Sequence, residues 1–347
     1  MLKSKTAFVL GAGTSFEVGL PTGLGLANEI SGLLNLRFPN GHDLSDGDRL
    51  IFDAMRMYSA KSQQPPDYIN KLIHAGWAIR EAMPLAKSID NFVDAHREDA
   101  AIELSSKLSI ARAILLAEGR TLLKFDEKAR KPILASEQIR KTWLPSMFKL
   151  LNEGVSRVDM GSIFDNVVFI VFNYDRCLEH YLYYALIEYY RLTEIESQDI
   201  MKNLKIVHPY GTVGALSWQD GSTVSYGCNP SPTELLQSAC GIRTFTEGFS
   251  DTQNSPNSIS ALIAACERIV FLGSAFHSIN IKFFTSEKKD KAYQIIGTGY
   301  KISDDSIGIL ENQLRANFRG PTSVKINNRF TCSDFFDHYE FRLRSSA

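Results

Sequence analysis

Neither sign of charge is in excess in this sequence, and no apolar run is long. Lys and Arg number 38 and Asp and Glu number 39, which gives a formal net charge of −1. This balance argues against a protein that coats nucleic acid or an anionic membrane surface. The longest apolar-rich stretch, residues 163–172, is interrupted by Asp165 and Asn166 and is about half as long as a membrane-spanning helix. We therefore expect a soluble protein with no membrane partner and no direct nucleic-acid partner.

Cysteine is also scarce, and its spacing excludes two classes of site. The chain has five cysteines, an odd number, and none belongs to a C-x-x-C pair. This arrangement disfavours a disulfide framework and a four-thiolate zinc site. We expect no bound metal, zinc in particular, and a location in the reducing cytoplasm. The five residues are Cys177, Cys228, Cys240, Cys266 and Cys332.

The rest of the composition is that of a folded globular protein. Of 347 residues, 44% are hydrophobic and 22% are charged, which argues against a disordered chain. A chain of this length holds one large α/β domain or two domains of ordinary size. The order of its segments favours a single domain over residues 1–347.

A helical block interrupts a pattern of strands and helices. Residues 6–10 are β-rich and end at a glycine, and residues 24–34 have helical spacing. Between about 48 and 152, apolar residues recur at helical intervals and prolines mark the breaks between helices. We interpret residues 48–152 as a large helical insertion that packs as a layer beside the ligand cleft. Within it, residues 88–93 are expected at the cleft rim or in a subunit contact.

Strands return after the helical block. Residues 167–172 form a continuous apolar run, typical of a strand buried on both faces of a parallel sheet. Residues 221–257 are rich in Gly, Ser, Thr, Asn and Pro and are expected to form a long loop. The alternation predicts an α/β fold with a Rossmann-like, doubly wound parallel sheet. Further strands are expected at 204–207, 269–272, 293–296 and 323–326, and helices at 175–191, 258–268 and 304–318.

A glycine loop follows the first strand. Small residues at this point let the backbone approach a pyrophosphate closely, and the N–H groups of the next helix can bind the anion. The dinucleotide fingerprint needs a third glycine where Phe16 stands, so this is not the dehydrogenase loop. A tight turn without a ligand explains the same residues equally well. The loop consists of Gly11, Ala12, Gly13, Thr14 and Ser15, and Gly19, Leu20 and Pro21 follow it.

Polar residues follow the most apolar strand. Asn173 and Asp175 stand just beyond residue 172. In an open α/β sheet, ligands bind outside the carboxyl ends of the strands, so these two side chains are candidates for one cleft. The alternative for Asp175 is that it only caps the following helix, a common role for aspartate.

Two later strand ends carry further candidates. His208 follows a short strand and is a plausible general base near neutral pH, although a loop histidine bonded to backbone is the alternative. Gly273 and Ser274 follow the strand expected at 269–272, where a hydroxyl and N–H groups can hold a ribose or a phosphate. A similar strand end lies at 297–299.

Together, and in this order, these segments resemble the sirtuin-like superfamily. That family has a G-A-G-x-S loop followed by G-[IL]-P, an N-x-D after a later strand, a His-Gly element and a late G-[ST]-S-like strand end. The resemblance covers about 1–35 and 163–330 and leaves the helical block unexplained. The matching segments are G-A-G-T-S at 11–15, G-L-P at 19–21, N-Y-D at 173–175, H-P-Y-G at 208–211 and G-S at 273–274.

The resemblance implies a Rossmann-like fold that binds NAD⁺ and breaks its nicotinamide glycosidic bond. Carried over by position, the 11–15 loop, with Pro21 after it, would bind the cofactor, and the loop would hold the pyrophosphate. Asn173 would face the nicotinamide ribose and the attacking nucleophile, Asp175 would recognise the carboxamide and His208 would be the base. Gly273 and Ser274 would contact the adenosine side.

The chain departs from the protein-deacylating sirtuins in three places. It lacks their zinc module of two C-x-x-C pairs, and Thr22-Gly23-Leu24 stands where they have Asp-Phe-Arg. Two residues separate His208 from Gly211, where their histidine directly precedes glycine. Without the zinc module and the arginine, the chain is similar to the bacterial sirtuin-like NAD⁺ hydrolases of antiphage defence, which often carry a helical insertion.

The resemblance therefore implies an NAD⁺ glycohydrolase that takes NAD⁺ as substrate and releases nicotinamide and ADP-ribose. Such an effector would deplete cellular NAD⁺ and would need control, so we expect a homo-oligomer and an activating partner such as a translocase-type ATPase. Two alternatives stay open. One is an NAD⁺-dependent protein-lysine deacylase, and the other is a subunit that binds NAD⁺ or ADP-ribose without turnover.

Overall fold

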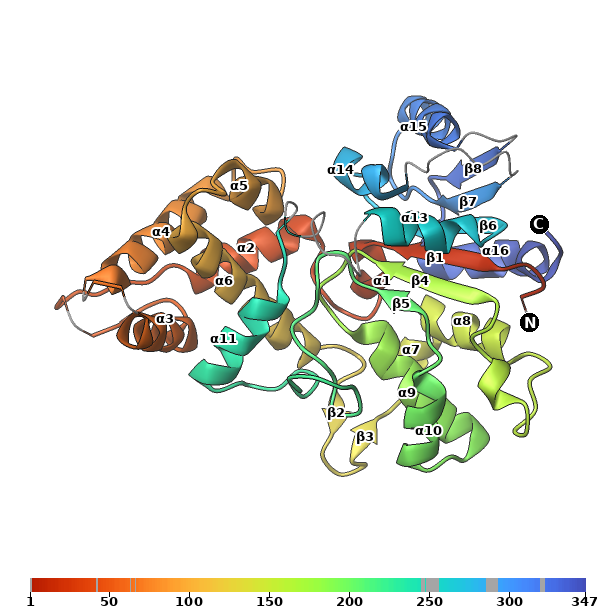
Figure 1. Cartoon of the computed structure of the whole chain (residues 1–347), viewed down its shortest axis with the longest axis horizontal. Helices are drawn as coiled ribbons and strands as arrows, with labels where there is room; N and C mark the ends of the chain where they lie inside the picture. The colour runs from red at the N-terminus through yellow and green to blue at the C-terminus, as the bar shows by residue number, and fades with distance from the viewer. Residues whose placement is uncertain are drawn as a thin grey trace.

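A six-stranded parallel sheet forms the centre of the protein (Figure 1). The computed structural model describes residues 2–41, 43–62, 64–65, 67–244, 247, 256–284, 293–318 and 322–347. The strand order is β5-β4-β1-β6-β7-β8, and every ladder between neighbours is parallel. This order confirms the predicted α/β, Rossmann-like fold. The strands are β1 (Thr6–Leu10), β4 (Val167–Val171), β5 (Ile206–Val207), β6 (Arg268–Leu272), β7 (Gln294–Thr298) and β8 (Ser323–Asn327).

Strand β1 lies at the middle of the sheet because all of its side chains are apolar or small enough to be buried. Every residue of β1, β4 and β6 is buried. Thr6 pairs with Val167 of β4 on one side and with Arg268 of β6 on the other. The chain fills the β4 side first and then crosses to β6, so the strand order reverses between β1 and β6. A ligand crevice is expected outside the carboxyl ends of the strands at such a reversal.

Helices cover both faces of the sheet, because alternate residues of each strand point to opposite faces. Ala7 and Val9 belong to the hydrophobic cluster on one face, with residues of α13 (Pro256–Ala264) and α15 (Asp304–Asn317). Phe8 and Leu10 belong to the cluster on the other face. That second face is covered by α8 (Trp143–Asn152), α9 (Cys177–Tyr190) and α16 (Cys332–Arg344).

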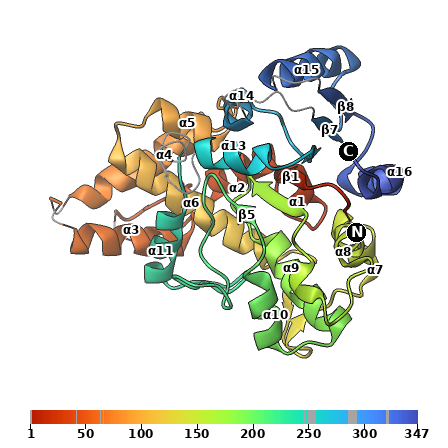
Figure 2. The same ribbon diagram turned by 45° about the vertical axis from the view of Figure 1, so that its right-hand side comes forward.

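A helical lobe lies beyond the carboxyl ends of the strands, at the left of Figure 1. Its long central helix, α6, contacts α2, α4 and α11. The lobe shares one hydrophobic cluster with the sheet: Leu108 and Leu115 of α6 and Val168 and Ile170 of β4 belong to it. The view in Figure 2 shows the lobe and the sheet side by side again. The lobe consists of α2 (Gly23–Leu33), α3 (Arg49–Lys61), α4 (Tyr68–Ala82), α5 (Ile89–Ala95), α6 (Ala100–Glu118) and α11 (Pro232–Gly241).

The block at 48–152 is mostly helical. It also holds a small hairpin of β2 (Phe125–Asp126) and β3 (Lys131–Pro132), and α8 at its end packs with α9 and α16. One expectation about local structure was wrong. The expected loop at 221–257 contains α11, whose capping box joins Ser231 and Glu234. Residues 245–246 and 248–255 of that stretch lie outside the described residues.

Short elements complete the chain. Across the described ranges, no helix has both the length and the apolar character that crossing a membrane requires. The remaining elements are α1 (Ala12–Phe16), α7 (Glu137–Arg140), α10 (Glu194–Met201), α14 (Ser278–Ile281) and the 3₁₀ turns η1 (Met160–Ser162) and η2 (Lys282–Phe284).

Candidate functional site

A cavity of about 160 Å³ lies at the carboxyl ends of β1, β4 and β6, beside the point where the strand order reverses. Segments far apart in the sequence meet there. Seven residues singled out from the sequence line this cavity: Gly11, Ala12, Ser15, Pro21, Asn173, Asp175 and Ser274. Four others do not line it: Gly13, Thr14, His208 and Gly273.

Two helices begin at the edge of the cavity. Ala12, the first residue of α1, lines it, and so do Thr22 and Gly23, where α2 starts. The Thr22 side chain makes no capping hydrogen bond to α2. The first N–H groups of a helix have no partner within the helix and attract anions. At α1 the N–H groups of Gly13 and Thr14 already donate to the carbonyl oxygens of Gly273 and Gly11, so the start of α2 is the part of the cavity edge that suits a negatively charged group.

The glycines at the strand ends serve the contact between two loops. The N–H of Gly13 donates to the carbonyl oxygen of Gly273 over 2.9 Å. A Cβ atom on Gly11 would lie 2.6 Å from the same oxygen, and Gly273 has a φ of +58°. Only glycine fits such an approach and such a backbone. The close turn accounts for these glycines without a ligand. Ala12, between Gly11 and Gly13, lines the cavity.

Asn173 ties the end of β4 to the glycine loop. Its Nδ2 donates to the Ser15 hydroxyl over 2.9 Å and to the carbonyl oxygen of Gly11 over 3.1 Å. The side chain is 8% exposed and lines the cavity. Because Nδ2 is used within the protein, Oδ1 is the atom that can accept a hydrogen bond from a water or a ribose hydroxyl.

Asp175 both caps a helix and lines the cavity. Its Oδ1 accepts a 3.1 Å hydrogen bond from the N–H of Cys177, the first residue of α9. Burial raises the pKa of the Asp175 carboxyl, and hydrogen bonds from Ser15 and Cys177 oppose that rise. From the sequence, the helix cap and the cleft residue were alternative roles for Asp175. In the structure the two roles are compatible.

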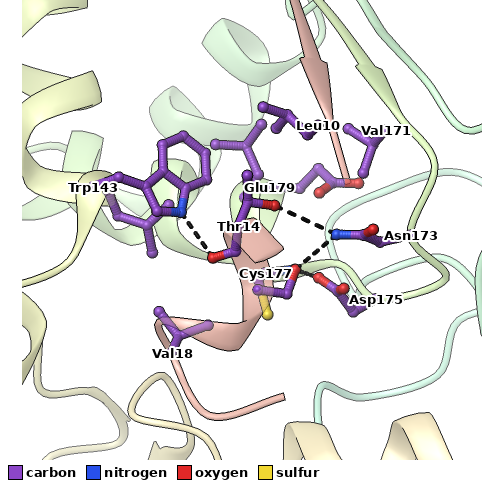
Figure 3. A pocket seen from close by; sticks show the side chains of 12 residues that line it. Leu10, Thr14, Val18, Trp143, Val171, Asn173, Asp175, Cys177 and Glu179 are labelled. Atoms are coloured by element: carbon purple, nitrogen blue, oxygen red, sulfur yellow. Dashed lines mark hydrogen bonds between the residues drawn. The ribbon is translucent and has the colours of Figure 1, made fainter. Parts of the chain in front are cut away.

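A second, smaller space lies behind Asn173 and Asp175 (Figure 3). It measures about 10 Å³. On its far side, Trp143 Nε1 donates to the carbonyl oxygen of Thr14 over 2.9 Å. The glycine loop is thus held from three directions, by Asn173, by Gly273 and by Trp143, so its position is fixed by the protein itself.

His208 lies outside the 160 Å³ cavity, behind Asn173. Its Nδ1 is 3.1 Å from the carbonyl oxygen of Asn173, and its Nε2 is 2.8 Å from Glu179 Oε1. Burial disfavours the charged imidazole, but the Glu179 carboxylate and the Asn173 carbonyl outweigh it and raise the pKa of His208. Both nitrogens face acceptors, so both donate. In this arrangement His208 has no free nitrogen with which to accept a proton from a ligand.

The histidine that lines the cavity is His277. Burial, together with the charge of Lys87, lowers the pKa of His277, so its imidazole is neutral at neutral pH and can accept a proton. Gly273 and Ser274 mark the strand end in the sequence, but no local pattern points to the histidine three positions further on as a residue of the cavity.

The helical lobe supplies a carboxyl group to the cavity. Ser88 and Asp90, at the start of α5, line it. Residues 88–93 were expected at the cleft rim or in a subunit contact, and these two lie at the cavity. The hydroxyl of Tyr174 donates to Asp90 Oδ1. Burial raises the pKa of Asp90, and the Tyr174 hydrogen bond opposes that rise. This contact joins the lobe to the end of β4.

Comparisons with known proteins add no family to this geometry. No protein-family model matches the chain, and a search of curated proteins finds no significant match. Within the described ranges, no group of three or more His, Cys, Asp or Glu side chains is arranged to hold a metal ion. The arguments below therefore rest on the cavity and its residues.

Proposed function

We propose that the protein is an NAD⁺ glycohydrolase, which cleaves NAD⁺ to nicotinamide and ADP-ribose. The observation that carries the proposal is the meeting of the resemblance-bearing segments at one cavity, at the reversal of the strand order. Ser15, Asn173, Asp175 and Ser274 come from three strand ends and line the same space. In open α/β folds this is where dinucleotides bind.

The edge of the cavity suits the pyrophosphate. We place it at the N-terminus of α2, near Gly23, with Ala12 of the glycine loop beside it. Neither Lys nor Arg is among the described residues that line the cavity. Backbone N–H groups and hydroxyls would therefore hold the anion, as helix N-termini do elsewhere. Ser274, at the end of β6, is placed toward the adenosine side.

The chemistry follows from the bond that breaks. The nicotinamide ring is cationic in NAD⁺, so it leaves as a neutral molecule when the electron pair of the glycosidic bond moves to its ring nitrogen. The ribose then has oxocarbenium character, which a carboxylate such as Asp175 stabilises. In this proposal Asp175 also recognises the carboxamide.

Water completes the reaction. Asn173 Oδ1 accepts a hydrogen bond from the attacking water and so orients it toward C1′ of the ribose. The new bond joins the water oxygen to C1′, and the released proton goes to His277, the neutral imidazole in the cavity. We therefore assign the base to His277 in place of His208, whose nitrogens are both engaged.

The biological role proposed with this activity is depletion of NAD⁺ in antiphage defence. It rests on the resemblance to the zinc-free bacterial NAD⁺ hydrolases. An enzyme of this kind needs control, so the proposal includes homo-oligomerisation and an activating partner such as a translocase-type ATPase.

Incubation of purified protein with NAD⁺, with and without an acetyl-lysine peptide, tests the activity. Release of nicotinamide and ADP-ribose without peptide supports the hydrolase. Nicotinamide released only with peptide identifies a deacylase. Binding of NAD⁺ without nicotinamide release, measured by calorimetry under the same conditions, favours a non-catalytic binding subunit. Absence of both binding and turnover contradicts the proposal.

A further inference from the structure

Another cavity, larger than that of the candidate site, has walls made mostly of aromatic rings. It measures about 280 Å³ and shares no lining residue with the candidate site. Its walls come from the β2 region, from α9 and from residues 216–226. The residues that matter for the argument are Phe125, His180, Tyr184, Leu216, Trp218 and Tyr226.

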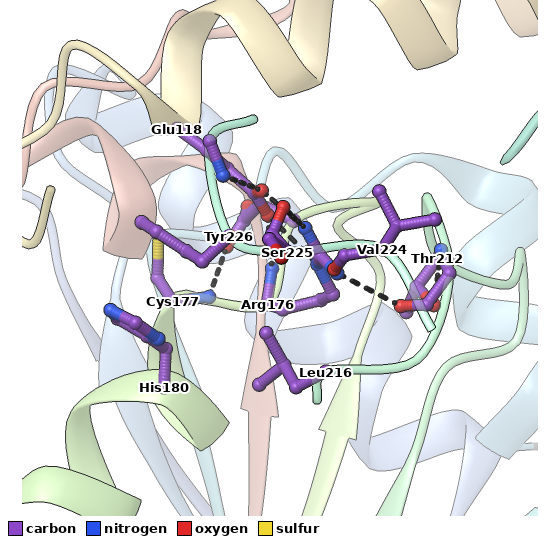
Figure 4. A network of polar contacts seen from close by, with 12 residues as sticks. Glu118, Arg176, Cys177, His180, Thr212, Leu216, Val224, Ser225 and Tyr226 are labelled. Atoms are coloured by element: carbon purple, nitrogen blue, oxygen red, sulfur yellow. Dashed lines mark hydrogen bonds and ion pairs between the residues drawn. The ribbon is translucent and has the colours of Figure 1, made fainter. Parts of the chain in front are cut away.

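The buried wall of this aromatic cavity is held in place by a polar network (Figure 4). Tyr226 stacks on His180 with 3.9 Å between ring centroids, and its hydroxyl lies 3.1 Å from Cys177 Sγ. Arg176 donates to the carbonyl oxygens of Val224 and Ser225, the two residues that precede Tyr226.

A buried ion pair anchors that network. Arg176 and Glu118 are 1% and 0% exposed, with 2.6 Å between Nη2 and Oε2. The second carboxylate contact, from Arg176 Nε to Oε1, measures 3.1 Å. A bidentate pair of this kind fixes geometry as well as adding energy. The aromatic wall is therefore formed in advance of any ligand, which lowers the entropy lost on binding.

Two polar atoms distinguish this cavity from a purely apolar one. His180 Nε2 donates to the carbonyl oxygen of Leu123 over 3.1 Å, and burial lowers the pKa of His180 to about 3. The ring is thus neutral, and its Nδ1 is an acceptor. Trp218 Nε1 has almost no accessible surface and no hydrogen-bond partner within the described part of the chain, so it reaches a ligand only if the indole turns toward the cavity. A buried donor of this kind is normally satisfied.

The chemistry of the lining selects an uncharged ligand. Among the described residues that line the cavity, none is acidic or basic apart from the neutral His180. An aromatic cage for a cation gains from a nearby carboxylate, and a phosphate needs a cation or free N–H groups, so neither ligand is favoured. Phe125, Ser217 and Ser225 are exposed and form the mouth, while His180 and Tyr226 are buried at the floor.

We propose that this aromatic cavity binds a planar, uncharged heteroaromatic ring of the size of a nucleobase, presented as a nucleoside. The rings supply stacking surfaces, Trp218 Nε1 donates to a ring acceptor, and His180 Nδ1 accepts from a ring N–H or amino group. The volume of about 280 Å³ is close to the lower end of the roughly 300–1,000 Å³ that small-molecule sites span. This site does not depend on the activity proposed above.

Calorimetry and saturation-transfer NMR with adenosine, guanosine, cytidine and uridine test the proposal on the full chain. At least one nucleoside is expected to bind saturably. Ser225→Trp, at an exposed position in the mouth, is expected to abolish that binding, whereas Ser346→Trp at the exposed C-terminus leaves it unchanged. Trp218→Phe keeps an aromatic wall and loses only the N–H donor, so it should weaken binding about 5–10-fold.

Three results overturn the proposal. The first is no saturable binding of any of the four nucleosides at millimolar concentration. The second is binding that survives Ser225→Trp, which places the ligand elsewhere, the candidate site included. The third is binding of tetramethylammonium as tight as that of the best nucleoside, which identifies a cation cage.

Discussion

His208 donates a hydrogen bond from Nδ1 to the backbone carbonyl oxygen of Asn173, over 3.1 Å. Its other nitrogen faces Glu179, which is 3% exposed, at 2.8 Å. A protonated ring satisfies both partners at once. The histidine therefore supports the strand end that carries Asn173, and it does so in its charged form. A substitution of His208 would therefore change activity by moving Asn173.

The first prediction concerns pH. Since the folded state raises the pKa of His208 above the ordinary value of 6.5, the ion pair stabilises the protein fully below that value. The stabilisation is lost as the pH rises through the raised pKa. His208→Gln removes one partner of a buried pair and should lower the free energy of unfolding by about 3 kcal/mol below pH 6.5. Denaturant titrations of both proteins across a pH series measure the difference, which should shrink as the pH rises.

The matched control for that series is His338→Gln, at an exposed position on α16, where no comparable change is expected. A difference between wild type and His208→Gln that stays constant or grows with pH contradicts a charged His208.

The second prediction separates the two histidines. His277→Ala should lower kcat for NAD⁺ cleavage by about 10²–10⁴-fold, because it removes the proton acceptor in the cavity. Its thermal midpoint should stay close to that of the wild type, since His277 is only partly buried. Steady-state release of nicotinamide measures the effect, with the exposed His74→Ala as control. Turnover of His277→Ala within a few-fold of wild type would assign the base elsewhere.

The third prediction concerns Asn173. Asn173→Ala removes the group that orients the water and should lower turnover by about 10²–10⁴-fold. It also removes the hydrogen bonds to Ser15 and Gly11, so a modest loss of stability accompanies it. Asn312→Ala, on the surface of α15, is the control and should change neither quantity. A folded Asn173→Ala protein that keeps more than a tenth of the activity is incompatible with the proposed role.

The fourth prediction concerns the two loops at the strand ends. A Cβ atom at Gly273 would lie 2.4 Å from the Thr14 nitrogen, at a φ of +58°. Gly273→Ala should therefore destabilise the protein by more than about 2 kcal/mol and disturb Ser274. Gly308→Ala in α15 meets no atom within 4 Å and should be neutral or stabilising by up to about 1 kcal/mol. Equal unfolding midpoints for Gly273→Ala and Gly308→Ala would contradict this explanation of the strand-end glycines.

The central strands were predictable from local sequence. The apolar run that became β4 and the glycine loop after β1 are signals of a few adjacent residues. So is the capping box of Ser231 and Glu234, with Pro232 between them, which marks the start of α11 within a polar stretch. The polar composition of the whole stretch favours a loop, but this local helix signal outweighs it.

The cavity was predictable only in part. Asn173 and Ser274 follow strands, and strand ends meet by the geometry of a parallel sheet. Asp90 reaches the cavity through the packing of the helical lobe, and no local pattern encodes that contact. His208 followed a strand as well, but the buried Glu179 on α9 turned it into a structural partner. Asn173 and Ser274 line the cavity and His208 does not, although all three follow strands. Only the tertiary contact of His208 with Glu179 separates these outcomes.

The central position of β1 has a consequence for biosynthesis. β1 leaves the ribosome before both of its partner strands, which begin at Val167 and Arg268. Until Val167 has been made, a strand that is covered on both sides in the folded protein has no neighbour, and such apolar edges need protection from aggregation. The candidate site also requires Ser274, which follows β6. A nascent chain that has not reached β6 therefore lacks one wall of the cavity, so a product that stops before β6 is expected to lack the candidate site.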